Sequence, residues 1–245
     1  MNKKIVIQFT ALTFVIRFVF GGGVVICEQL GFMLNDYTLL YVPFLISAWS
    51  PAIASLIVLR KNNEVSSIKE WLRNIFNIKT SAFNYLFVVA LLIVYMVSML
   101  VTSGLNSVSP IYMFFIWLLA SLLAGAGMEE AGWRYILQPE LEKKFGYLLS
   151  CLIVAPIHIL WHIPLGVGTS FLWNLINIFG ITFALGAIYK ISRGNIFLCV
   201  LFHCMINAGM STIMPNQTTL GVIITSIIMI SVSITVVSIN KHIKS

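Results

Sequence analysis

Two adjacent carboxylates, Glu129 and Glu130, follow a long apolar run that begins near Ile111. Ionisable side chains inside a membrane helix cost several kcal/mol and are functional candidates by default. Arg134 comes four residues after Glu130, so these two share a helix face and can pair. Glu129 points about 100° away around that helix and is not neutralised by the pair. The motif indicates one structurally paired carboxylate and one free to act as a base; an ordinary salt bridge at a cytoplasmic helix end is the alternative.

Two more pairs of polar residues interrupt apolar segments farther along the chain. His158 and His162 are four residues apart, and so are His203 and Asn207, so each pair lies on one helix face. The first spacing also suits two metal ligands. A His–Asn pair aimed at one point can stabilise an oxyanion. The alternative for each pair is hydrogen bonding between helices, which membrane bundles use in packing.

These three groups fall in three helices of the C-terminal half, where they supply a base, an imidazole and an oxyanion pair. Those are the parts needed for water-mediated acyl hydrolysis. A rise of 1.5 Å per residue puts Glu129 and His203 roughly 13 and 12 Å from the cytoplasmic ends of their helices. On the same scale His158 lies at roughly 16 Å and His162 at roughly 22 Å, so depth favours His158.

The composition identifies the solvent in which these helices fold. The 245 residues are 59% hydrophobic and 9% charged, with a mean hydropathy of +0.97. Soluble domains carry about 25% charged residues, so a soluble globule and a disordered chain are both excluded. The net charge of +7 reflects basic residues that flank membrane helices, and we expect no nucleic-acid partner. The four cysteines lie in apolar runs without Cys-x-x-Cys spacing and are expected to be buried hydrophobes.

The hydropathy pattern predicts an all-α bundle, a single integral membrane domain over residues 1–245 with eight transmembrane helices. These are expected at about 5–27, 39–59, 83–103, 111–138, 147–166, 172–189, 195–213 and 219–239. Pro139 is expected to end the fourth helix. The loops 28–38, 104–110, 167–171 and 214–218 contain no Lys or Arg, which predicts that both termini are cytoplasmic. The polar segment 60–80 has apolar residues at helical spacing and is expected to form an interfacial amphipathic helix.

The motifs resemble those of the CPBP family, the CAAX prenyl proteases and bacteriocin-processing enzymes also called the Abi family. They are Glu-Glu-x-x-x-Arg at 129–134, Trp-His-x-Pro-Leu at 161–165 and His-x-x-x-Asn at 203–207. The resemblance covers about 80 residues of the C-terminal half. It implies a glutamate-dependent intramembrane endopeptidase with eight transmembrane helices, in agreement with the independent helix count.

The resemblance also implies roles for individual residues. Glu129 would activate water with help from the histidine of the second motif, and His203 with Asn207 would form the oxyanion hole. Glu130 and Arg134 would support the first motif.

The second motif departs from the family pattern Phe-x-x-x-His, because Val154 precedes His158 and His158 precedes His162. The Trp-His-Ile-Pro-Leu context favours His162, and His158 remains the second candidate.

Other protease classes lack their motifs in this chain. Asp36 is the only aspartate, which excludes an aspartate dyad, and there is no His-Glu-x-x-His zinc motif. We expect no cofactor and no metal; zinc held by Glu129 with His158, His162 or His203 is the alternative.

The expected protein is a multi-pass peptidase of the bacterial cytoplasmic membrane that cleaves a peptide or membrane-tethered precursor, such as a pheromone or a bacteriocin-like peptide. The alternative is a non-proteolytic bacteriocin immunity or scaffold protein. The sequence does not indicate an oligomeric state.

Overall fold

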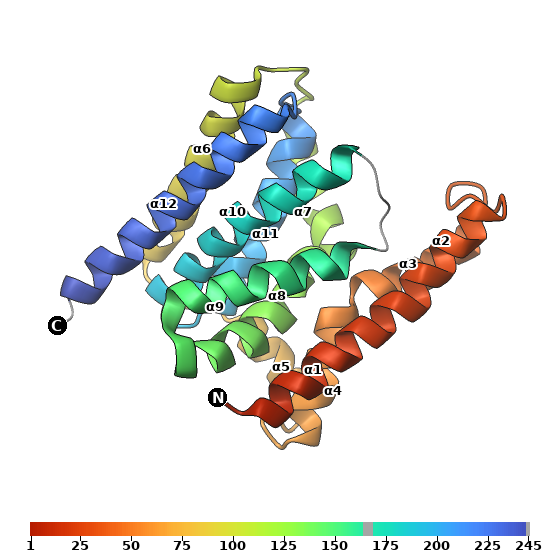
Figure 1. Ribbon diagram of the computed structural model, residues 1–245, viewed down its shortest axis with the longest axis horizontal. Coiled ribbons are helices and arrows are strands. Elements are labelled where there is room, and N and C mark those ends of the chain that lie inside the picture. The colour runs from red at the N-terminus through yellow and green to blue at the C-terminus, as the bar shows by residue number, and fades with distance from the viewer. Residues whose placement is uncertain (164–168, 244–245) are drawn as a thin grey trace.

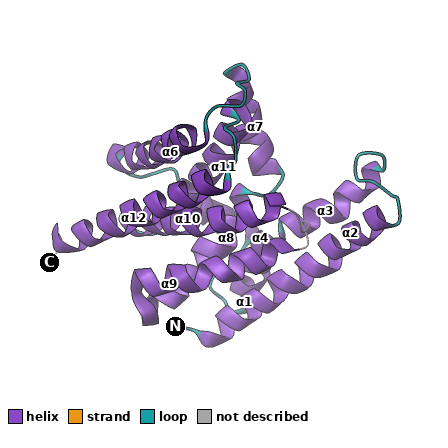
Figure 2. Cartoon of the chain, turned by 45° about the horizontal axis from the view of Figure 1, so that its top comes forward, coloured by secondary structure: helices purple, strands orange, loops and turns teal. Residues whose placement is uncertain are grey.

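The computed structural model describes residues 1–163 and 169–243, and these residues contain helices and loops without any strand (Figure 2). The α-helices are α1 (Lys3–Ile16), α2 (Gly22–Gln29), α3 (Tyr41–Ala48), α4 (Ser50–Lys61), α5 (Ile68–Ile75), α6 (Ala82–Ser103), α7 (Tyr112–Leu123), α8 (Glu130–Gly132), α9 (Gln138–His162), α10 (Thr169–Ile191), α11 (Ile196–Ile213) and α12 (Thr219–Ile243). Short 3-10 helices cover Thr38–Leu40 and Gly127–Glu129, and π-helical turns cover Arg17–Gly21 and Trp133–Leu137. The predicted all-α class is confirmed.

Several of these helices are long and apolar enough to cross a membrane. Within the described residues there are five, at Lys3–Gln29, Ala82–Ser103, Gly127–His162, Ile196–Ile213 and Thr219–Asn240. The pair α3 and α4, bent by 51°, makes a sixth if it is one span, and Tyr112–Leu123 and Leu175–Ile191 are shorter apolar helices. The chain is therefore a multi-pass membrane protein, while the count of eight crossings stays a prediction.

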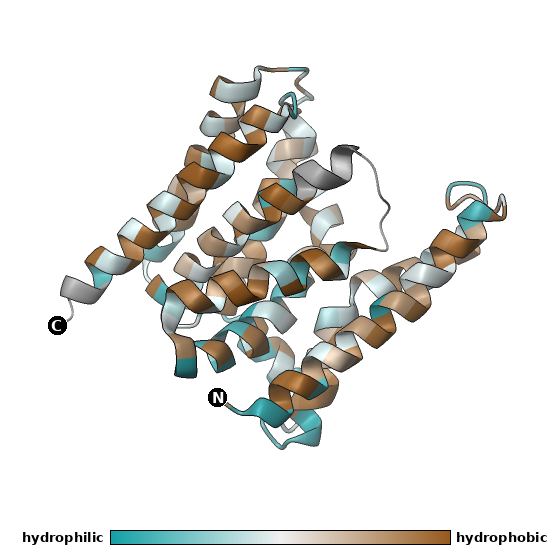
Figure 3. Ribbon diagram, in the orientation of Figure 1, coloured by the Kyte–Doolittle hydropathy of each residue, from teal (hydrophilic) through white to brown (hydrophobic). Residues whose placement is uncertain are grey.

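The helices form one bundle in which the N-terminal rod of α1 and α2 lies at one edge and α6 and α12 lie at the other (Figure 1). Helix α1 packs along α4, α11 packs along α7, and α10 packs along α12. Both termini and the segment 60–80 lie toward the lower end of Figure 1, and the loops 30–38, 104–111 and 214–218 lie at the upper end. The fourth predicted loop without Lys or Arg, 167–171, lies partly outside the described residues, and the cytoplasmic location of the termini stays a prediction. Hydrophobic residues predominate along the helices (Figure 3), and many large apolar side chains are exposed, as expected for helices that face lipid.

The fourth predicted helix differs from the expectation, because it is broken at residues 124–126. Gly125 adopts a φ of +101°, and a Cβ there would lie 2.8 Å from the Trp49 side chain, so only glycine fits. The Trp49 indole N–H donates to the Leu123 carbonyl at 3.0 Å and so satisfies a carbonyl at the end of α7. The chain then resumes as the 3-10 turn that carries Glu129.

The prediction that Pro139 ends this helix is wrong. Pro139 occupies the first turn of α9, directly after the π-helical turn. A proline is tolerated there because its missing N–H has no obligatory partner in a first turn. The helical path breaks instead at Gly146, whose φ of 70° and ψ of −178° lie outside the helical region.

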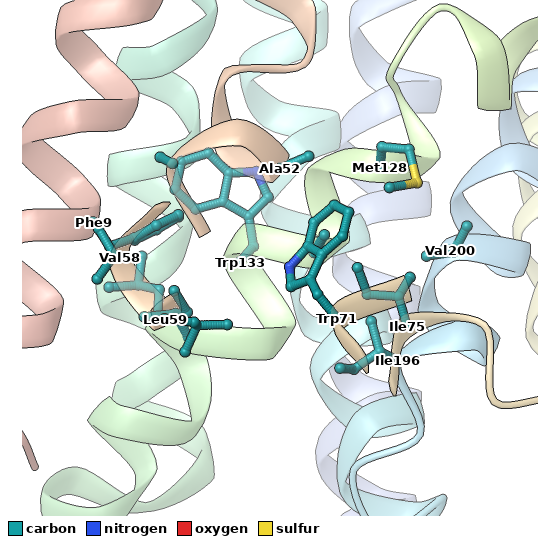
Figure 4. Packing of buried hydrophobic residues seen from close by; sticks show 14 of the residues in the cluster. Phe9, Ala52, Val58, Leu59, Trp71, Ile75, Met128, Trp133, Ile196 and Val200 are labelled. Atoms are coloured by element: carbon teal, nitrogen blue, oxygen red, sulfur yellow. The ribbon is translucent and has the colours of Figure 1, made fainter. Parts of the chain in front are cut away.

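The core beneath the broken helix joins both halves of the chain. Phe9, Ala52, Trp133 and Met128 belong to one buried apolar cluster (Figure 4). The predicted amphipathic segment contains the helix α5, which buries Trp71 in the same cluster. This packing holds the segment 127–137 between the N-terminal helices and α11.

Candidate active site

Glu130 lies at the centre of a buried network of three charged or ionisable side chains. Its Oε2 is 2.8 Å from Arg134 Nη1, and neither side chain is exposed to solvent. Its Oε1 is 2.8 Å from Nδ1 of His203 on α11. Arg134 Nη2 also donates to the Thr182 carbonyl of α10 at 3.2 Å. The predicted pairing of Glu130 with Arg134 is confirmed, and this network ties α8, α10 and α11 together.

Glu129 faces a different helix and pairs with His158. Its Oε2 lies 2.7 Å from Nε2 of His158, and both side chains are buried. The close approach of this turn to α11 depends on Gly127, where a Cβ would collide with the Cys204 sulfur and lie 3.2 Å from Val200. Glu129 was expected to stay outside the Glu130–Arg134 ion pair. It does so, and it contacts the His158 imidazole instead.

His162 lies one turn beyond His158, at the end of α9. Its Nδ1 donates to the His158 carbonyl at 3.0 Å, which leaves Nε2 as the atom that could act on a ligand. One ligand atom each from Glu129, His158 and His162 lies within 4.8 Å of the others. The structure thus brings both candidate histidines to Glu129, but only His158 contacts its carboxylate. The assignment of the second motif to His162 stays a prediction.

His203 and Asn207 both lie on α11, but each has a partner of its own. His203 contacts Glu130, and Asn207 Nδ2 donates to Ser121 Oγ of α7 at 3.0 Å. Their hydrogen bonds therefore do not converge on one point in this structure. An oxyanion role for the pair stays a prediction.

Two tryptophans that the sequence pattern did not single out, Trp133 and Trp161, pack against the two histidines. The Trp133 ring lies 5.1 Å from the His158 ring, and the Trp161 ring lies 4.8 Å from the His162 ring, between centroids. Arg17, from the π-helical turn of the first rod, has its guanidinium 4.2 Å from the Trp161 ring centroid. The signal for Arg17 was a single basic residue that interrupts an otherwise apolar run.

The distance between Glu129 and His158 is shorter than the spacing of two zinc ligands. Two ligands of a tetrahedral zinc ion, each at about 2.0–2.2 Å from it, lie roughly 3.3 Å or more apart. Glu129 Oε2 and His158 Nε2 are 2.7 Å apart, which is a hydrogen-bond distance. Zinc would need these two side chains to separate, so the arrangement suits proton exchange better than joint coordination.

These features define a class of protein: a helical membrane protein whose buried carboxylate–imidazole pair suits hydrolysis inside the bilayer. A family model for the Rce1-like type II CAAX prenyl endopeptidases matches residues 110–209, the region that contains all three motifs. CAAX prenyl protease 2 of Methanococcus maripaludis is 27% identical over 204 residues, covering 74% of this chain and 72% of the relative. Both matches agree with the resemblance of the three motifs to the CAAX protease (CPBP) family.

Proposed function

We propose that this chain hydrolyses a peptide bond inside the membrane with water activated by Glu129. The contact between Glu129 and His158 at 2.7 Å, buried within the bundle, carries this proposal. Glu130 cannot share the role, since Arg134 and His203 already occupy both of its oxygens. Glu130 is paired with the permanent charge of Arg134, whereas Glu129 pairs with the imidazole of His158, with which it can exchange a proton.

The reaction proceeds by general base and then general acid catalysis. Glu129 takes a proton from water as the oxygen attacks the scissile carbonyl carbon, and a tetrahedral oxyanion forms. The C–N bond then breaks, and the proton held by Glu129 passes to the leaving amine. His158 orients the carboxylate and the water, and His162 presents its Nε2 from the next turn.

The residues of α11 serve the same reaction from the opposite side. His203 is fixed by Glu130, so a proton on the imidazole can be directed to a developing negative charge. Asn207 would turn from Ser121 to the oxyanion when substrate binds. Arg134 holds Glu130 in place and is a positioning residue, as is Glu130 itself.

The substrate that we propose is a membrane-associated peptide or protein precursor, such as a pheromone or bacteriocin-like peptide of a bacterial cytoplasmic membrane. The exposed apolar side chains suit contact with a precursor that lies in the lipid. The reaction needs no metal in this proposal, because the proton transfers rest on the carboxylate and imidazole alone.

The experiment compares secreted and membrane peptides from cells that express the wild-type chain, Glu129→Gln or Glu64→Gln at matched levels. Glu64 is an exposed carboxylate outside the site, so its variant controls for the chemical change. A peptide released by the wild type and by Glu64→Gln, and lost with Glu129→Gln, supports proteolysis and identifies the substrate. Identical peptide profiles with an intact cellular phenotype would instead indicate the alternative, a non-proteolytic immunity or scaffold protein.

A further inference from the structure

Arg17 is a buried cation within the first membrane-spanning rod. Arg17 is 1% exposed and lies in the π-helical turn Arg17–Gly21. At 1.5 Å per residue it lies about 21 Å from Lys3 and about 18 Å from Gln29, near the middle of the span. A charge at this depth is expensive and marks a functional residue by default.

The contacts of Arg17 satisfy only part of its guanidinium. Nε donates to the Trp161 carbonyl at 3.0 Å, and Nη1 donates to Ser47 Oγ at 2.7 Å. Nη2 is buried and has no hydrogen-bond partner among the described residues. Among the described residues no carboxylate forms a direct ion pair with Arg17, so Glu129 acts on its charge only at longer range.

Arg134, a second buried arginine in the same bundle, differs from Arg17 in having an ion-pair partner. It is equally buried, but Glu130 lies 2.8 Å from it and balances its charge. Buried charges are normally paired, because an isolated ion is costly to remove from water. The difference between the two arginines is that the described residues offer Arg17 no direct charge partner, which a bound molecule could supply.

The free donor of Arg17 lies beside the candidate active site. The guanidinium is 4.2 Å from the Trp161 ring centroid, and that ring is 4.8 Å from the ring of His162. Arg17 also interacts electrostatically with Glu129 and with His162. A group bound by Nη2 would therefore belong to a molecule that also occupies the site of hydrolysis.

We propose that Arg17 binds a carboxylate of the peptide substrate and so sets where the scissile bond lies. A guanidinium recognises a carboxylate with matching geometry and compensates its charge. The depth of Arg17 argues against a lipid phosphate, which lies at the membrane surface. The carboxylate is the C-terminus of the peptide or an acidic side chain near the scissile bond. The identity of the ligand as a peptide rests on the proposed function.

The test uses the protein in lipid nanodiscs and a library of fluorescently labelled peptides with an apolar anchor. Each peptide is made with a C-terminal carboxylate or carboxamide, and with Glu or Gln near the cleavage site. Binding is measured on Glu129→Gln by fluorescence anisotropy, with and without Arg17→Met, so the result does not depend on hydrolysis. Arg17→Lys keeps the charge, and Ser47→Ala removes one neutral partner while leaving the guanidinium in place.

The carboxylate form should bind about 10- to 100-fold tighter than its neutral counterpart, and Arg17→Met should abolish that preference. Arg17→Lys should restore it in part, and Ser47→Ala should retain it. Loss with the carboxamide identifies the C-terminus as the ligand, and loss with Gln identifies an acidic side chain. Equal binding of acid and neutral forms, or an unchanged preference in Arg17→Met, would overturn the inference. Failure of the wild type to cleave any bound peptide would instead refute the peptidase function.

Discussion

Replacing Glu130 with Gln tests whether this carboxylate is the structural member of the adjacent pair. The substitution keeps the shape of the side chain but removes the charge that balances Arg134. Both side chains are fully buried, so the guanidinium would keep its charge without access to water. The variant should therefore lose stability in addition to any loss of activity.

The size of the effect follows from the geometry. Glu130 makes two contacts of 2.8 Å, one to Arg134 and one to His203. Removing one partner of a buried ion pair costs about 3–5 kcal/mol. At about 2–4 °C per kcal/mol for a chain of this size, the thermal midpoint should fall by roughly 6–20 °C.

The assay is thermal unfolding of the purified protein in one detergent, followed by intrinsic tryptophan fluorescence. Trp133 is fully buried beside His158, so it reports on the unfolding of this region. The double variant Glu130→Gln/Arg134→Met removes the cation as well, and a buried ion pair can be replaced by apolar residues at little cost. It should recover at least half of the lost midpoint.

A midpoint for Glu130→Gln within 2–3 °C of the wild type, roughly 1 kcal/mol, would refute the structural role. A double variant as unstable as the single variant would show that the loss comes from packing or from His203, and not from the uncompensated charge of Arg134.

Replacing His158 with Gln should lower the kcat for peptide release by about 10²–10⁴-fold, and more than His162→Gln does, because only His158 contacts Glu129, the proposed base; equal losses would contradict this ranking. A chelator such as 1,10-phenanthroline should leave peptide release unchanged, whereas loss that added zinc restores would favour the metal alternative. Gly132→Ala should lower the free energy of unfolding by about 1–3 kcal/mol, because a Cβ would lie 2.7 Å from the Phe9 ring. Gly22→Ala, where the space is open, is the matched control in thermal unfolding.

The features that the sequence predicted correctly depend on local periodicity. Four-residue spacing placed Glu130 and Arg134 on one helix face, and the structure has that ion pair. The apolar runs became helices, and the amphipathic pattern around Trp71 became α5 with its apolar side buried. Each of these results needs only the geometry of a single helix.

The features that the sequence did not predict depend on contacts between helices. The break near Gly125 requires Trp49 from a helix far away in the sequence. The contact of Glu129 with His158 depends on the position of α9 along its axis relative to the turn that carries Glu129. From the sequence, the depth along the helix favoured His158, whereas the motif context favoured His162. Arg17 belongs to no local sequence pattern, and the role that we propose for it rests on contacts between helices and on the unpartnered Nη2 among the described residues.

The adjacency of Glu129 and Glu130 explains how one motif serves two sites. Neighbouring residues in a helical turn point about 100° apart, so they cannot share a partner. Glu129 faces His158 of α9, and Glu130 faces His203 of α11 and its own Arg134. Glu130 balances the charge of Arg134, so Arg134 does not neutralise Glu129. The partner of Glu129 is instead an imidazole, which can exchange protons, whereas a guanidinium cannot. The same arrangement makes Glu130 necessary for stability and Glu129 available for chemistry, so the two substitutions should separate these properties.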